Sequence, residues 1–247
     1  MCTVSWQHLP DGGYELFVNR DEQRTRAIAF GPRVFLRDGV RYIAPLDAEA
    51  GGTWLAVNEY GISFTVLNGN KAPRTGMFRS RGSVIPELAS AASVAEAALR
   101  ILALDIAEVQ PFTLAVVGPG RGSLLAEWDG AQRRLSAATE SSLPLTSSSL
   151  DAKRARAKRR LLYRQYGSGA DFHRSHGTVA DAFSPCMHRD DAVTVSFSSV
   201  RVRDGEVRFC YQPGPPCAPH GPAETVSLAI RERVADNEGI LCYPSLC

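Results

Sequence analysis

The sequence predicts an α+β fold in which two antiparallel sheets stack face to face and helices cover their outer faces. Strand pairs joined by tight turns occur near both ends of the chain, and helical stretches lie between them. The chain lacks the regular strand–helix alternation of a parallel sheet. Its 247 residues, 44% of them hydrophobic and 22% charged, are expected to form one domain spanning 1–247.

The strands are predicted as hairpins. Residues 2–7 and 14–19 flank Pro10-Asp11-Gly12-Gly13, where Asp-Gly favours the positive φ angles of a tight turn. Three further pairs of apolar strands flank short turns: 53–58 with 61–68, 112–117 with 123–128, and 192–203 with 206–210.

Helices are predicted where apolar residues recur at intervals of three and four. This pattern covers residues 84–104, with an interruption near Pro86, and a basic stretch at 150–166. Short helices are expected at 179–183 and 223–234. The tail of about 212–247 is rich in proline and is otherwise expected to be irregular.

Composition and charge exclude several classes of protein. The net charge is +2, and no apolar run is long enough to cross a membrane. The N-terminus lacks the basic and apolar regions of a secretory signal, so we expect a cytoplasmic location. No nucleic-acid partner is expected, because aromatic residues do not interleave with the basic ones. The sequence does not indicate whether the protein is a monomer or an oligomer.

One predicted helix concentrates positive charge. We expect a solvated helix face; the alternative is a docking patch for an anion such as a CoA phosphate, a haem propionate or a membrane surface. The residues concerned are Lys153, Arg154, Arg156, Lys158, Arg159 and Arg160.

The six cysteines include no C-x-x-C pair, and we expect neither a metal nor a cofactor. Cys186 and His188 stand two residues apart, so a metal pair or an axial haem ligand is the alternative for them. No second pair with metal-ligand spacing accompanies them, and we expect polar loop residues. The same expectation holds for His173 and His176.

Cys2 is the candidate reactive residue. A small residue at position 2 permits removal of Met1, which leaves Cys2 with a free α-amine. Such an amine has a pKa near about 8 and can act as a general base on its own thiol. A cysteine thiol is also the nucleophile that needs least activation.

The first hairpin brings charged residues beside the chain start. If Pro10 faces Gly13, facing residues sum to 23 and Cys2 faces Asp21. The Asp21 carboxylate would orient the amine, and a nearby Arg20 would favour the thiolate. A bulge would shift this register by one residue. The alternative is that Cys2 is incidental and residues 19–22 form a polar strand end.

Three motifs together carry a family resemblance. Met-Cys-Thr-Val at the start, Asn19-Arg20-Asp21-Glu22, and the glycine-rich stretch 51–58 resemble the NRDE family, whose eukaryotic member is the transport and Golgi organisation protein 2. The similarity is specific over the first seventy residues and thin over the rest. It implies a four-layer αββα sandwich of the N-terminal-nucleophile type, related to bile-salt hydrolases, penicillin V acylases and an acyltransferase of penicillin biosynthesis.

The resemblance also implies roles for particular residues. Residues 58–68 are similar to a bile-salt hydrolase segment whose last Asn helps form the oxyanion hole, which assigns that role to Asn68. Facing residues of the second hairpin sum to 119, which places Gly51 opposite Asn68. Ser147 stands where relatives carry a second functional Asn. The residues expected to bind substrate are Asn19, Gly51, Gly52, Trp54 and Ser147.

One position departs from the related hydrolases, which carry an Arg three residues before the matching Asp. Here that position is Val18, and the nearest Arg is Arg20. Neighbouring side chains on a strand point to opposite faces, so Arg20 is expected to point away from the face that Asp21 shares with the thiol.

We therefore expect a Cys-dependent hydrolase or acyltransferase for a small-molecule, non-peptide amide or a thioester, in which Cys2, Arg20, Asp21 and Asn68 are catalytic. The alternative is a non-catalytic carrier or chaperone that holds a hydrophobic anion such as haem, an acyl-CoA or a lipid in the same cleft.

Overall fold

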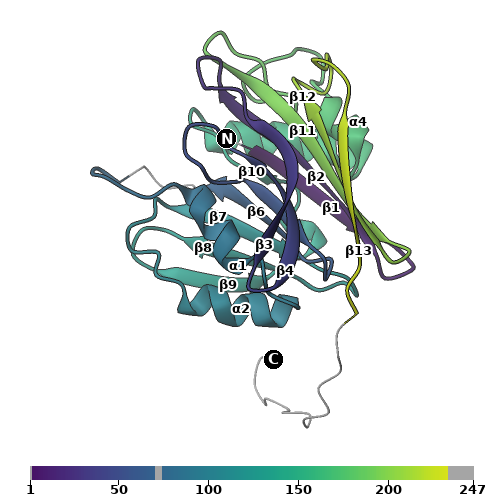
Figure 1. The fold of residues 1–247 in the computed structure, drawn as a ribbon. Helices are drawn as coiled ribbons and strands as arrows, with labels where there is room; N and C mark the ends of the chain where they lie inside the picture. The colour runs from purple at the N-terminus through teal and green to yellow at the C-terminus, as the bar shows by residue number, and fades with distance from the viewer. Residues whose placement is uncertain (1, 70–73, 233–247) are drawn as a thin grey trace.

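A computed structural model describes residues 2–69 and 74–232 and shows two stacked antiparallel sheets (Figure 1). The first sheet has six strands in the order β10-β1-β2-β11-β12-β13. Their bounds are β10 Leu145–Thr146, β1 Cys2–His8, β2 Tyr14–Gln23, β11 Ala192–Arg203, β12 Glu206–Pro213 and β13 Glu224–Ala229.

The second sheet has seven strands in the order β3-β4-β5-β6-β7-β8-β9, so every neighbour in space is also a neighbour in sequence. Their bounds are β3 Phe30–Arg37, β4 Val40–Leu46, β5 Leu55–Asn58, β6 Ser63–Asn68, β7 Phe112–Val117, β8 Ser123–Trp128 and β9 Arg133–Ala137.

Helices cover the outer face of each sheet, which confirms the αββα sandwich. Helices α1 (Val84–Leu88) and α2 (Val94–Ala103) lie against the second sheet, and α4 (Ala170–Arg174) lies beside the first (Figure 1). The long helix α3 (Ala152–Tyr166) packs on α4 and β10. None of the described helices is both long enough and apolar enough to span a bilayer.

The main core lies between the sheets and follows the two-residue alternation of the strands. Val4, Leu16 and Val200 of the first sheet meet Leu55 and Val57 of the second, and all five are completely buried. A second apolar cluster joins α1 and α2 to the outer face of the second sheet. Cys2 belongs to the core between the sheets, at one end of it.

The predicted register of the first hairpin is wrong by one residue. His8 faces Tyr14 and Cys2 faces Arg20, so facing residues sum to 22. The connection is a loop in which Gly12 takes the positive φ of +84°. A one-residue shift reverses which side chains share a face. Arg20, not Asp21, is therefore the cross-strand neighbour of Cys2.

The second hairpin is also shifted by one. Leu55 faces Thr65, so facing residues sum to 120, and β5 begins after the glycine pair. Asn68 pairs with Phe112 on β7. The prediction that Gly51 lies opposite Asn68 is wrong.

The helix predictions hold in part. Helix α3 is confirmed, whereas the stretch 84–104 is divided by residues 89–93 and not by Pro86. Pro86 lies in the first turn of α1, where a missing N–H costs nothing. Ser93 caps α2 by accepting the N–H of Glu96 at 3.0 Å.

Two predicted short helices are absent from the described residues. Residues 179–183 form turns, and a helix occurs instead at α4. Residues 214–223 are irregular as expected, but residues 224–229 form β13, which pairs with β12 along its whole length. Residues 233–247 lie outside the described part of the chain.

Candidate active site

The main chain of Cys2 is held by the segment that follows β10. The Cys2 nitrogen donates to Ser147 Oγ at 2.9 Å, and the Ser147 nitrogen donates to the Cys2 carbonyl at 3.1 Å. Both residues are buried, with 6% and 2% exposure. The position that the family resemblance assigns to a second functional Asn therefore contacts the nitrogen that becomes the α-amine if Met1 is removed.

Arg20 shares the inward face with Cys2, which corrects the expectation that it points away. Facing residues of an antiparallel pair project to the same side of the sheet. The guanidinium lies over the Trp54 ring, 4.3 Å from its centroid, and donates to Asp47 Oδ2 at 2.6 Å. Burial raises the pKa of the Cys2 thiol, Asp21 adds to the rise, and Arg20 opposes it.

A cavity of about 330 Å³ opens between the ends of the two sheets, and Cys2 lines it. The structure brings Arg20, Gly52, Trp54 and Asn68 to the same cavity. Five of the nine residues predicted for the site thus meet here. Asn68 is exposed at the end of β6, where its side-chain amide is accessible to a ligand.

Three arginines that the sequence analysis did not place at the site join Arg20 and give this cavity a net positive charge. Four guanidinium groups and two carboxylates line it, a difference of +2; they belong to Arg20, Arg26, Arg79 and Arg81, and to Glu22 and Asp47. Arg79 and Arg81 follow the turn segment after residue 74, and no spacing rule linked them to Cys2.

The Asp47 carboxylate accepts hydrogen bonds from two of the arginines. It accepts from Arg20 and from both Nε and Nη2 of Arg26, at 2.6 to 3.1 Å. Burial raises the pKa of Asp47, but the Ala50 N–H and the two guanidinium groups outweigh it, so the pKa lies below its usual value. Arg81 has no carboxylate partner within ion-pair distance among the described residues; its Nε donates to the Pro111 carbonyl.

Asp21 lies on the opposite face of β2, beneath α3. It is completely buried and accepts from Thr194 Oγ1 at 2.7 Å and from Arg159 Nη2 at 3.3 Å. The same guanidinium donates from Nη1 to the carbonyls of Cys2 and Ser147, at 3.4 and 3.5 Å. Asp21 is thus connected to the main chain of Cys2 through Arg159.

Arg159 corrects the expectation of a fully solvated basic helix. Its exposure is 1%, while Arg160 beside it is exposed. The sequence carries a signal for this, because Arg159 falls four residues after Ala155 and three before Leu162, both buried. The charge of the residue concealed its place on the apolar stripe of α3.

Asn19 and Gly51 do not line the cavity. The Asn19 side chain lies under α4 and donates to the carbonyls of His173 and Pro185 at 2.9 and 2.8 Å. Gly51 is exposed with φ of +67°, and its N–H closes the loop onto the Asp47 carbonyl. His173, expected at the surface, is completely buried.

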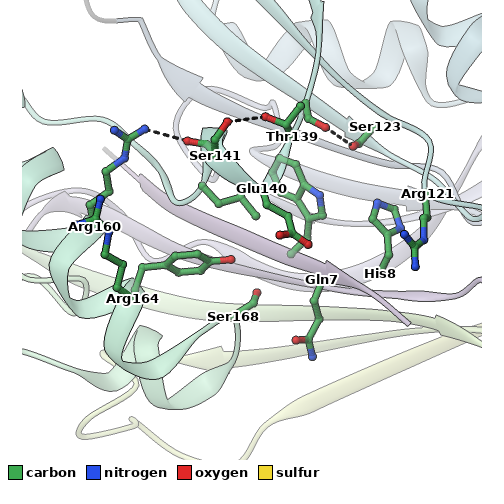
Figure 2. Close-up of a pocket in the computed structure, with 14 residues that line it drawn as sticks. Gln7, His8, Arg121, Ser123, Thr139, Glu140, Ser141, Arg160, Arg164 and Ser168 are labelled. Atoms are coloured by element: carbon green, nitrogen blue, oxygen red, sulfur yellow. Dashed lines mark hydrogen bonds between the residues drawn. The ribbon is translucent and has the colours of Figure 1, made fainter. Parts of the chain in front are cut away.

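A larger cavity of about 770 Å³ lies at the other end of β1 (Figure 2). Arg160 and Arg164 lie at one end of it and His8 and Arg121 at the other, with Glu140 between them. The seven residues of β1 separate His8 from Cys2 by roughly 20 Å. Cys2 does not line this larger cavity, so the larger cavity is not the candidate site.

Comparison with solved structures shows the fold. The chain is similar to penicillin V acylase from Agrobacterium tumefaciens at a TM-score of 0.52 and 11% identity, covering 85% of this chain and 82% of that one. It is similar to a Cys-to-Ala variant of conjugated bile acid hydrolase from Clostridium perfringens at a TM-score of 0.54 and 12% identity, covering 92% of both chains.

A third similar structure is the Caenorhabditis elegans orthologue of N-acylethanolamine-hydrolyzing acid amidase, with a TM-score of 0.53 and 13% identity over 81% of this chain and 92% of that one. At these identities the likeness concerns the fold alone. Comparison with curated proteins finds no sequence match. The family model described as Transport and Golgi organisation 2 matches residues 1–161, which include β1, β2, Asn68 and Arg159. The chain therefore belongs to the Transport and Golgi organisation 2 family, built on an N-terminal-nucleophile hydrolase fold.

Proposed function

We propose that the protein is an N-terminal-cysteine hydrolase or acyltransferase that acts on the amide or thioester of a small, negatively charged acyl compound. One observation carries the proposal. The nitrogen of Cys2 is bonded to Ser147 Oγ at 2.9 Å, while its thiol lines a cavity that also holds Arg20 and Asn68. The conjugated bile acid hydrolase of similar fold also has a cysteine as its second residue.

The chemistry requires a free α-amine, so the proposal includes removal of Met1. The amine takes the thiol proton as Sγ bonds to the substrate carbonyl carbon, and the C=O electron pair moves to oxygen. Asn68 donates to that oxyanion. Collapse breaks the C–N or C–S bond, and the proton goes to the leaving group. Water, or an acceptor amine or alcohol, then cleaves the thioester on Cys2.

The surrounding residues position these groups. Ser147 Oγ accepts one amine hydrogen and so directs the amine lone pair toward the thiol. Arg159 holds the Cys2 carbonyl and is itself held by Asp21. Asp21 and Arg159 are therefore positioning residues, because each acts on the nucleophile through other groups.

The charge of the cavity supports the choice of substrate class. With Asp47 shared by Arg20 and Arg26, the Arg81 guanidinium is available for an anion. Arginine binds carboxylates and phosphates in a bidentate manner. We expect the substrate to place a carboxylate or phosphate beside Arg81 while its carbonyl lies at Cys2.

The proposal is tested with the intact protein and two amides that differ only in a terminal carboxylate or carboxamide on the acyl chain. Cys2→Ala should abolish hydrolysis of the carboxylate substrate, and Arg81→Gln should raise its KM without affecting the carboxamide. Cys210→Ser, a change on β12 away from the cavity, is the matched control and should retain activity. Full turnover by Cys2→Ala would end the proposal.

A second candidate function, a carrier for a hydrophobic anion, has an observation of its own. A cavity of about 430 Å³ adjoins the first and shares Arg20, Glu22 and Arg26 with it. The apolar side chains of residues 27–29, Val193 and Val195 line this second space. An acyl tail beside a guanidinium group fits there without any use of the thiol.

Binding of a fluorescent fatty acid separates the two functions. A carrier retains its affinity in Cys2→Ala and in protein that keeps Met1, and it shows no turnover. An enzyme binds the same probe but hydrolyses a matched N-acyl amide only when Cys2 is the first residue. Loss of binding in Arg20→Met, with no loss in Arg208→Met, an exposed position that lines neither cavity, would place the probe in the shared space.

A further inference from the structure

Segments at the edge of the first sheet bring together two histidines and two cysteines that the proposed reaction does not use. His176 follows α4, Cys186 and His188 precede β11, and Cys217 lies between β12 and β13. One ligating atom from each lies within 4.8 Å of all the others. Cys186 is buried, both histidines are half-buried and Cys217 is exposed, so an ion can reach the cluster from solvent.

Four of the six separations between ligating atoms are close to those of a tetrahedral metal centre, and all six are within 4.8 Å. Zinc bonds of about 2.3 Å to sulfur and about 2.0–2.1 Å to nitrogen place tetrahedral ligands roughly 3.8 Å apart for S–S, 3.6 Å for S–N and 3.3 Å for N–N. The Sγ atoms of Cys186 and Cys217 are 3.5 Å apart. His188 Nε2 lies 3.6 and 3.4 Å from them and 3.1 Å from His176 Nε2.

The backbone around the ligands is fixed by its own hydrogen bonds. The Cys186 nitrogen donates to the Ser175 carbonyl at 3.2 Å, and the His188 nitrogen donates to the Asp181 carbonyl at 3.1 Å. His188 also forms a bridge with Val193 at the start of β11. The ligands of this segment are thus held in place by the fold, which lowers the entropy lost on binding an ion.

We propose that His176, Cys186, His188 and Cys217 form a structural zinc site. Two thiolates, two imidazoles and tetrahedral spacing are the donor set that zinc prefers, and four protein ligands leave no position for substrate. Binding releases the two thiol protons, and the two thiolates balance the charge of the ion. In this proposal the candidate metal pair Cys186–His188, the alternative to polar loop residues, is half of the site.

The zinc site would also hold in place the segment that packs on the face of β2 opposite the cavity. Between its two ligands, the Met187 nitrogen donates to Thr194 Oγ1 at 2.8 Å, and that hydroxyl donates to Asp21 at 2.7 Å. The adjacent Pro185 carbonyl accepts from Asn19. Zinc therefore ties the 175–191 segment to the loop before β13 at the point where this segment holds Asn19 and Asp21.

The test measures metal on the full-length protein purified under reducing conditions. We expect one zinc per chain by elemental mass spectrometry. Replacement by cobalt should give the visible absorption of a tetrahedral ion and a thiolate charge-transfer band. Cys217→Ser, an exposed position, should weaken zinc binding by at least about 100-fold, since even partners outside the ligand sphere are worth about 10–100-fold.

Matched controls separate this site from other donors. Cys210→Ser and His220→Gln should keep one zinc per chain, because neither residue belongs to the cluster. The double variant Cys242→Ser/Cys247→Ser should also keep it. Zinc content equal in wild type and Cys217→Ser, loss of zinc in the double variant instead, or a Cys186–Cys217 disulfide in the reduced protein would each overturn the proposal.

Discussion

Replacing Arg159 by Met is the most informative test of how the candidate site is held together. The side-chain exposures of Arg159 and Asp21 are 1% and 0%, so solvent does not screen the pair. Met fills nearly the same volume but donates no hydrogen bond, and it removes the Arg159 cation from the buried Asp21 carboxylate. Removing one partner of a buried pair costs about 3–5 kcal/mol.

The distances around Arg159 narrow the expected loss in the free energy of unfolding. The 3.3 Å separation from Asp21 is longer than the ~2.7–2.9 Å of a strong charge-assisted bond, which favours the lower end. The carbonyls of Cys2, Ser147 and Ser184 also lose a donor, at 3.4, 3.5 and 3.1 Å. We therefore expect Arg159→Met to lower the free energy of unfolding by about 3–4 kcal/mol.

Urea unfolding followed by fluorescence measures this loss, with metal content held constant. Arg160→Met is the matched control: its exposed guanidinium donates only to the Ser141 carbonyl among the described residues, and we expect a change within about 0.5 kcal/mol. The double variant Arg159→Met/Asp21→Asn should recover part of the loss, because the buried carboxylate that Arg159 faces is replaced by a neutral amide. A loss below about 1 kcal/mol for Arg159→Met alone would refute the reasoning.

Three further predictions concern single residues. Gly52→Ala should destabilise by about 1–3 kcal/mol in urea, because its Cβ would lie 2.7 Å from the Gly82 carbonyl carbon. Burial lowers the pKa of His173 to about 3, so between pH values of about 6.5 and 3 only the unfolded state binds a proton at this residue. The free energy of unfolding should therefore fall by about 1.4 kcal/mol per pH unit as the pH drops through this window. His173→Gln should remove that slope. Arg20→Met should slow alkylation of Cys2 by iodoacetamide at pH 7, since loss of the guanidinium removes a cation that opposes the rise in the thiol pKa and so lowers the thiolate fraction.

Each of these predictions has a control within the chain. Gly122→Ala meets the Val94 side chain at 3.4 Å and the Pro119 carbonyl oxygen at 3.8 Å, both ordinary contacts, and should change stability by less than about 1 kcal/mol. His220→Gln should keep the pH slope, and Arg24→Met, whose guanidinium donates to the Arg189 carbonyl, should leave alkylation unchanged. Equal effects in a variant and its control would contradict the corresponding prediction.

The strands that were predicted well are those with strong local signals. The bounds of β7, β8 and β11 agree with the expected 112–117, 123–128 and 192–203. Each of these strands is a run of apolar residues, or of alternating apolar and polar residues, that is bounded by a turn containing glycine. Strand β3 was missed because it is a mostly exposed edge strand that contains Pro32 and lacks clear alternation. Strand β13 depends on pairing with β12, a long-range contact that no local pattern reveals.

The sequence named five of the residues that line the cavity beside Cys2, but it did not predict how they are arranged. The loop at Gly12 is not the two-residue turn that the sequence suggested, and the resulting shift exchanged the places of Arg20 and Asp21. Cys2 and Arg20 therefore meet in the cavity, and Asp21 lies on the other face. The cluster around His188 escaped prediction because its members come from segments that only the fold brings together.

The proposed function depends on one chemical step: Cys2, with a free α-amine after removal of Met1, attacks a carbonyl carbon. Treatment of the intact protein with a β-lactone, followed by mass spectrometry of the N-terminal peptide, tests this chemistry most directly. We predict a peptide that begins at Cys2 and carries one acyl group, while the exposed Cys217 remains unmodified. A peptide that retains Met1, or acylation of Cys217 in preference to Cys2, would contradict the account.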